Sequence, residues 1–126
     1  MARTAVAYSN LVANSNLADP AGTAVASGAG NGAQIPATSG GGAFPELTVL
    51  RVSNASGGSG TASVLAGALP LAPAAGQGNL TVTVANAATQ WIGPFESGRF
   101  LQNDGSMIME TSVAMTVTAF KAPRNT

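Results

Sequence analysis

The alternation in Leu80–Val84, LTVTV, decides the fold, because apolar and hydroxyl side chains change places at every residue. Successive side chains of a β-strand point to opposite faces of the sheet, so this stretch places its apolar residues on one face. Met115–Ala119, MTVTA, repeats the pattern, and Glu46–Val52, ELTVLRV, nearly does. The additional apolar Leu50 indicates a strand with cover on both faces. We therefore expect an all-β protein.

Further strand patterns occur between Gly- and Pro-rich breaks in the rest of the chain. They are predicted at about 4–9, 24–27, 61–66, 90–93, 98–103 and 106–110. Asp104-Gly105 predicts a two-residue hairpin turn between the last two, because glycine supplies the positive φ that such a turn needs. About eight short strands without a helix predict an antiparallel β-sandwich or a jelly-roll-like barrel.

The chain of 126 residues has the length of one ordinary domain, and we expect residues 1–126 to form a single β-sandwich domain. Within it, the Gly-rich stretch 22–45 is expected to be a long loop or an extended arm that orders against a neighbour. Residues 121–126 are expected to form a C-terminal tail. Chain termini are free to reach a neighbouring subunit, so the residues around Arg3 and this tail are candidate arms.

Charged side chains are scarce, since five basic and five acidic residues give a net charge of zero. The 44 consecutive residues from Val52 to Phe95 carry no charge at all. A free monomer of 12.3 kDa exposes about 6,000 Å², and a small soluble domain does best with ~25–35% charged residues on its surface. Either sister subunits cover much of this surface, or Ser, Thr, Asn and Gln alone keep a monomer soluble.

Composition also excludes several kinds of chemistry. The sequence contains neither His nor Cys, so it has no disulfide, no imidazole base and no zinc site built from these ligands. The five carboxylates show no pair at motif spacing, and no helical pattern follows Gly28–Gly32, GAGNG, to present a phosphate site. We expect no enzymatic activity, no cofactor and no bound metal.

Nucleic acid and membranes are not expected as partners. The chain has no basic stripe that would neutralise phosphates. Its most apolar window, Leu65–Pro73, is interrupted by one glycine and two prolines and is far shorter than the ~20 residues that cross a bilayer. The first residues lack the apolar core of a secretory signal.

The segment Trp91–Leu101, WIGPFESGRFL, holds the only tryptophan, two of the four phenylalanines and two of the ten charges. One interpretation is a strand, a corner at Gly93-Pro94 and a second strand, with Trp91 and Phe100 in the core. The other is a subunit contact anchored by Trp91 or Phe95, with Arg99 paired to Glu96 or to a partner's carboxylate. Aromatic residues and arginine dominate interface hot spots, which supports the second interpretation, and the two interpretations can hold for different residues.

Several short motifs occur in an order that resembles small all-β structural proteins of tailed bacteriophages, of the head-decoration or capsid-cementing type. The motifs are Leu50–Asn54 (LRVSN), Gly78–Val82 (GNLTV), Trp91–Phe100 (WIGPFESGRF) and Thr116–Arg124 (TVTAFKAPR). The stretch 22–45 departs from the pattern because it is longer and richer in glycine. The resemblance implies a β-sandwich that forms homo-oligomers, often trimers, on an icosahedral shell, without catalysis or a cofactor.

We therefore expect a non-enzymatic virion structural protein that decorates or cements a bacteriophage head. It would be made in the host cytoplasm and end on the capsid surface, where its partners would be sister subunits and the major capsid protein. Many small contacts would add up through multivalency. The candidate contact residues are Arg3, Trp91, Pro94, Phe95, Glu96, Arg99, Lys121 and Arg124.

Two alternatives stay open within the structural class, a phage tail or fibre component and a small coat protein that builds a shell itself. A different class is a carbohydrate-binding β-sandwich module, for which Trp91 and Tyr8 are the amphipathic aromatic side chains. A small hydrolase would need a carboxylate pair, such as Glu96 with Asp104 or Glu110, and nothing in the sequence singles out such a pair.

Overall fold

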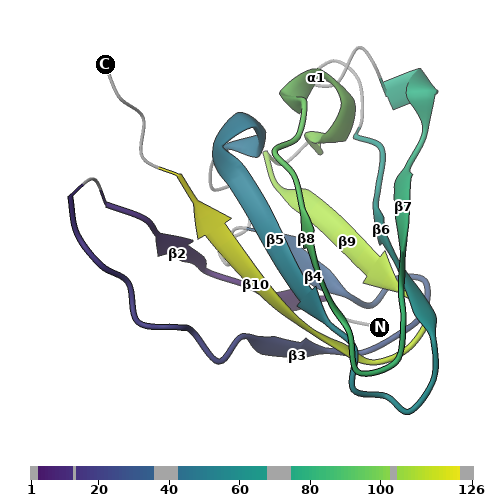
Figure 1. The fold of residues 1–126 in the computed structure, drawn as a ribbon. Coiled ribbons are helices and arrows are strands. Elements are labelled where there is room, and N and C mark those ends of the chain that lie inside the picture. The colour runs from purple at the N-terminus through teal and green to yellow at the C-terminus, as the bar shows by residue number, and fades with distance from the viewer. Residues whose placement is uncertain (1–2, 13, 36–42, 68–74, 103–104, 123–126) are drawn as a thin grey trace.

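Two mixed five-stranded sheets pack face to face in the computed structural model (Figure 1), which describes residues 3–12, 14–35, 43–67, 75–102 and 105–122. Sheet A contains, in spatial order, β1 (Thr4–Ala5), β4 (Ala33–Ile35), β9 (Met107–Thr111), β6 (Gly60–Val64) and β7 (Leu80–Val84). Sheet B contains β2 (Tyr8–Asn10), β10 (Met115–Lys121), β5 (Thr48–Ser53) and β8 (Thr89–Ile92), with β3 (Thr23–Val25) also paired to β10.

The hydrophobic core lies between the inner faces of the two sheets and confirms the alternation found in the sequence. Leu50 and Val52 of sheet B are completely buried, as are Met107 and Met109 of sheet A. In β5, buried and half-buried residues alternate and none is exposed, as expected for a strand covered on both faces. The all-β sandwich is thus confirmed, and the sheets form an open sandwich, not a closed barrel.

The prediction of purely antiparallel pairing is wrong at the N-terminal segment. The strand expected over 4–9 is divided into β1 and β2, which belong to different sheets. Between them lies Val6, which is only 2% exposed and donates its backbone N–H to Gln34 O at 2.9 Å. The chain therefore crosses the core at Val6 and continues in the same direction, so that β1 pairs parallel with β4 and β2 pairs parallel with β10.

The strand predicted over 98–103 is replaced by a single helical turn, α1 (Ser97–Phe100). The backbone N–H groups of Arg99 and Phe100 both donate to Glu96 O at 3.1 Å. This turn brings the Phe100 ring against the Phe95 ring, edge to face at a centroid distance of 5.6 Å, and both rings enter the core. A strand would place residues five apart on opposite faces.

The predicted turn at Asp104-Gly105 is retained in part. The Gln102 N–H donates to Ser106 O at 2.8 Å, and Gly105 has a φ of +83°. The arm that enters the turn is not a strand, so the predicted hairpin is wrong. Asp104 itself lies outside the described residues.

The stretch 22–45 is more ordered than a long loop, since it contains β3, β4 and the start of a short 3-10 helix, η1 (Pro45–Leu47). Gly32 makes the close approach of β4 to β9 possible. Its φ is +91°, and a Cβ at this position would lie 2.1 Å from Met109 O. Residues 36–42 of the expected arm lie outside the described residues.

A second short helix and the end of β10 complete the described fold. A second 3-10 helix, η2 (Ala75–Gln77), precedes β7. Of the expected C-terminal tail, Lys121 is the last residue of β10 and pairs with Thr48, while 123–126 lie outside the described residues. None of the helices in the described part of the chain is long and apolar enough to span a membrane.

Candidate interaction surface

The outer face of sheet A is polar. Alternation along β6 and β7 directs the side chains of Thr61, Ser63, Thr81 and Thr83 away from the core. Ser63 and Thr81 lie directly opposite each other, and their hydroxyl oxygens are 3.0 Å apart. Such cross-strand hydroxyl pairs stabilise a solvated sheet face.

Sheet B presents aromatic side chains on its outer face. Trp91 lies opposite Arg51 in the β5–β8 ladder and is 61% exposed. Its indole stacks on the Phe120 ring at a centroid distance of 5.4 Å with 27° between the planes. The Arg51 guanidinium carbon lies 5.8 Å from the centre of the indole and 5.5 Å from that of Phe120. We call these three residues the Trp91 platform.

Arg51 fixes the platform through three further partners. Its guanidinium donates to the Asp19 carboxylate, to Pro20 O and, at 3.1 Å, to the Thr118 hydroxyl. The Arg51 side chain is only 15% exposed, whereas that of Asp19 is 83% exposed. The segment before β3 is therefore attached to the outer face of sheet B, and the charge of Arg51 is compensated where it is buried.

Five large apolar side chains are exposed among the described residues. They are Leu11, Val12, Leu17, Phe44 and Trp91. The first three lie between β2 and β3, where the chain runs outside the sheets (Figure 1), and Phe44 directly precedes η1. Trp91 is the most ordered of them, because it lies within a strand and stacks on Phe120.

The structure places the other predicted contact residues in several different settings. The Arg3 guanidinium pairs with the Glu110 carboxylate at 2.9 Å on the outer face of sheet A, away from the Trp91 platform. Lys121 holds its ammonium 3.8 Å above the centre of the exposed Phe44 ring. Arg124 lies outside the described residues.

Within the segment 91–101, the two interpretations divide between residues. Trp91 is exposed, so its predicted place in the core is wrong, whereas Phe100 is buried as predicted. Phe95 is only 4% exposed and packs into the core instead of facing a partner. Pro94 and Glu96 are exposed at the corner, where the Gly93-Pro94 peptide is cis.

Arg99 does not pair with Glu96 among the described residues. Its guanidinium donates to Gly78 O at 3.0 Å and to Asn79 O at 3.3 Å, and it covers the Phe100 ring at 4.8 Å. Arg99 therefore ties α1 to the segment that enters β7.

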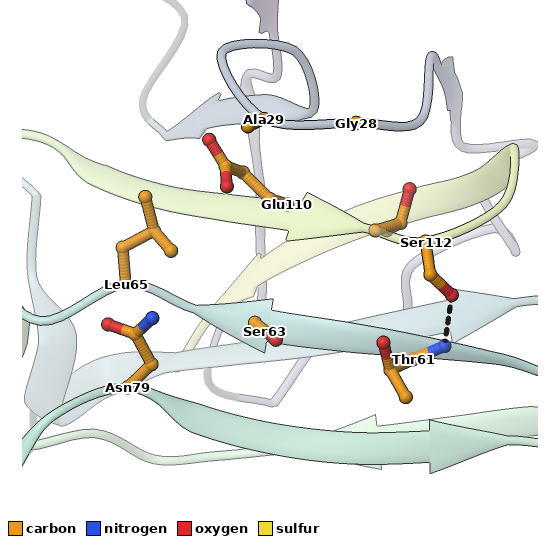
Figure 2. A pocket seen from close by; sticks show the side chains of 9 residues that line it. Gly28, Ala29, Thr61, Ser63, Leu65, Asn79, Glu110 and Ser112 are labelled. Carbon is orange, nitrogen blue, oxygen red and sulfur yellow. Dashed lines mark hydrogen bonds between the residues drawn. The ribbon is translucent and has the colours of Figure 1, made fainter.

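A shallow hollow of about 290 Å³ lies on the outer face of sheet A (Figure 2), between β6, β9 and residues 28–29. On its floor the Thr61 N–H donates to Ser112 Oγ at 2.8 Å, as the dashed line shows. Glu110 contributes the only carboxylate among the residues that line the hollow. Groups of acidic residues that could hold a metal ion are absent from the described part of the chain.

The electrostatics of Glu110 indicate a structural role. Partial burial raises the pKa of its carboxyl, but the Gly30 N–H at 2.9 Å and the Arg3 guanidinium outweigh this effect and hold the pKa below its ordinary value. A general acid needs a raised pKa so that it keeps its proton, whereas this environment favours the ionised carboxylate. Glu110 and Arg3 instead join β9 to the N-terminal segment and to residue 30.

Sequence reasoning missed Arg51 and Phe120 as parts of the surface. The available signal was their position in the alternating strands, since opposite residues in the β5–β10 register share a face. To use this signal one must know which strands are neighbours, and the sequence alone does not specify that.

Fold and surface together define an open β-sandwich with one hydroxyl-rich face and one face on which the Trp91 indole is exposed. In comparisons with known proteins, no family model, no curated protein and no solved structure matches this chain. The argument for function therefore depends on the surface of the chain itself.

Proposed function

We propose that this chain is a non-enzymatic virion structural protein that decorates a bacteriophage head. The observation that carries the proposal is the Trp91 platform, in which an exposed indole is backed by the buried Phe120 ring, on a molecule with only ten charged residues. The resemblance of its motifs to head-decoration proteins supports the same reading.

The two unlike faces give the proposal an orientation. The outer face of sheet B, with the exposed Trp91, faces the shell, and the hydroxyl-rich face of sheet A faces solvent. Burying the exposed part of one indole contributes about 3 kcal/mol per copy at the usual value per unit area. A single contact of this size is weak, but an array of linked subunits multiplies it through multivalency.

Co-purification with virus particles tests the proposal. Particles from lysates of cells that make the protein are separated on a density gradient, and the chain is quantified by mass spectrometry in each fraction. We expect the chain to travel with filled or empty heads. Its absence from every particle fraction would overturn the proposal.

A matched pair of variants then tests the orientation. Trp91→Ala removes the platform, and we expect it to reduce the number of copies bound per head at least ~10-fold, the factor that 1.4 kcal/mol represents. Thr83→Ala, on the outer face of sheet A, is expected to bind like the wild type. Equal binding by the two variants would contradict the assigned orientation.

Carbohydrate binding is a second candidate, favoured specifically by the exposure of Trp91. A flat indole backed by Phe120 is suited to stack on a pyranose ring, and Trp91 is the only tryptophan, so its fluorescence reports such stacking directly. Titration with a panel of hexoses and a glycan array test this candidate. A saturable fluorescence change that Trp91→Phe weakens would favour it over decoration.

A further inference from the structure

We propose that two copies of this chain pair through β7, edge to edge and antiparallel, so that sheet A continues across both molecules. The inference rests on the proposed function, since it names a contact between sister subunits. It concerns the margin of sheet A, whereas the platform lies on the outer face of sheet B.

The first observation is that β7 is the longest strand at a sheet margin in the described part of the chain. It has five residues, against two in β1, three each in β2 and β3, and four in β8. All five pair with β6 on one side, and Figure 1 shows β7 at the margin of its sheet. Among the described residues no strand pairs with the other side of β7, so the backbone groups there are available to an added strand.

The second observation is that β7 lacks the devices that usually protect such an edge. Charged side chains, prolines and bulges prevent most edge strands from pairing with another molecule. Leu80–Val84 contains no charged residue and no proline, and its pairing with β6 runs residue by residue without a bulge. By contrast, Arg3 precedes β1, and Arg51 lies beside Trp91 of β8.

The ends of β7 are held in place, which leaves an ordered strand between them. Asn79 O, just before the strand, accepts a bond from Arg99 at 3.3 Å. Val84 O, its last carbonyl, accepts a bond from the side chain of buried Asn54 at 2.9 Å. A partner strand would therefore meet a preformed template and would not have to order it.

The sequence of β7 favours a second copy of the same chain as the occupant. LTVTV is nearly a palindrome about Val82, so a two-fold axis through Val82 places Thr81 opposite Thr83 of the other copy. The apolar Leu80 and Val84 meet in the same way. Hydroxyl residues thus face hydroxyl residues on the outer face, as Ser63 and Thr81 already do within the molecule.

The burial of the side chains along β7 also favours a second copy at this edge. Val84 is completely buried, but Leu80 and Val82 are only half-buried although they pack against the core. A second copy on this edge would cover both. Because no charge lies on the strand of either copy, the two edges meet without like-charge repulsion.

The symmetry of this pair agrees with the proposed orientation. A two-fold axis perpendicular to the sheet keeps the outer faces of sheet A on the same side of the dimer. Both Trp91 platforms then face the opposite side together, which allows two platforms to contact one shell. The unit is a dimer, in contrast to the trimer that the family resemblance implies.

Sedimentation equilibrium of the purified chain tests the inference. Five residues per copy are fewer than a stable interface contains, so we expect a weak dimer whose mass rises from 12.3 kDa towards twice that value between ~10 μM and ~1 mM. A wild-type chain that stays monomeric throughout this range would overturn the inference.

Charge variants identify the edge. Thr81→Lys with Thr83→Lys places like charges directly opposite one another across the proposed axis, and we expect at least a ~10-fold weaker dimer. The control is Thr61→Lys with Ser63→Lys, which adds the same charge to the same face one strand further from the edge. We expect this control to change the dissociation constant less than ~3-fold. Equal effects of the two pairs would contradict the assignment to β7.

Mixing complementary variants separates the loss of an interface from the loss of the fold. Thr81→Glu with Thr83→Glu is expected to be monomeric alone but to form a dimer with the lysine pair, since opposite charges then face each other. A mixture that stays monomeric, although circular dichroism shows both partners folded, would refute pairing through β7. If the chain forms the dimer but binds no particle, only the proposed function is refuted. If it binds particles but stays monomeric, only this inference is refuted.

Discussion

At the scale of single residues, the segment Trp91–Leu101 divides between the surface and the core. Phe100 is buried as predicted, but Trp91 is exposed. An aromatic residue in a short strand gives little indication of its face, because β8 has only one neighbouring strand and its first three residues are all exposed. The face of Trp91 becomes clear only from its partner in the ladder, because Trp91 lies opposite Arg51 on the outer face of sheet B.

Arg51→Met is expected to loosen the Trp91 platform while keeping most of the stem that packs on it. The three donated hydrogen bonds are lost, but Asp19 is so exposed that it returns to water at little cost. We expect about 1 kcal/mol less stability in urea unfolding and a red shift in the fluorescence of Trp91. Asp19→Asn is the control and is expected to change stability by less than about 0.5 kcal/mol. An equal loss in both variants would show that the ion pair, and not the aromatic packing, holds the platform.

Glu110 makes the stability of the fold depend on pH. Its folded pKa is lowered from 4.5, so the ionised carboxylate stabilises the fold above that pH. This stabilisation is lost as the pH falls through the folded pKa. Glu110→Gln is therefore expected to flatten the stability profile below about pH 5, as measured by denaturant unfolding at a series of pH values. The exposed Glu96→Gln serves as a control, and a profile as flat as that of Glu110→Gln would contradict this account.

At the scale of elements, several strands were predicted well and some connecting segments were not. The strands expected near 61–66, 80–84, 106–110 and 115–119 are present within about two residues of their predicted bounds. The error over 98–103 has a packing cause, since Phe95 and Phe100 can share a pocket only if a helical turn separates them. A contact between two particular side chains, such as the Phe95 and Phe100 rings, cannot be predicted from the local pattern of apolar and polar residues.

Gly32→Ala tests the contact between β4 and β9. The added methyl group would meet Met109 O at 2.1 Å while the backbone keeps a φ of +91°, so we expect a loss of about 3 kcal/mol or more in thermal or urea unfolding. Gly57→Ala is a matched control, because Gly57 has a similar φ of +97° but nothing lies within 4 Å of the added atom. It is expected to cost about 1 kcal/mol. Similar losses at both positions would show that backbone strain alone decides the effect.

At the scale of the whole molecule, the all-β sandwich followed from the sequence but its topology did not. Alternation fixes the face of each residue within its strand, whereas strand partners depend on contacts between distant segments. The division of the N-terminal segment at Val6 is the clearest case, since one continuous pattern serves two sheets. The same limit explains why the Trp91 platform, which joins β5, β8 and β10, was only partly predicted.

Association of this molecule is expected to be nearly independent of salt. Arg3 and Arg51 are paired within the chain, and the proposed contacts lie on uncharged strands and aromatic rings. Screening weakens attractions between exposed charges but leaves apolar burial largely unchanged. We expect both dimer formation and head binding to change less than ~3-fold between 50 mM and 500 mM NaCl, measured by sedimentation and particle pull-down. A steep loss of binding with salt would indicate an electrostatic interface instead.

The crossing of the chain at Val6 also has a mechanical consequence. Tension applied ahead of β1 and beyond Lys121 would pull the parallel neighbours β2 and β10 in opposite directions along their length. The ladder that joins Tyr8, Ser9 and Asn10 to β10 would then be sheared, with its bonds resisting together, whereas an antiparallel hairpin unzips one bond at a time. The parallel β2–β10 ladder is thus built to resist stretching of the sandwich from its two ends.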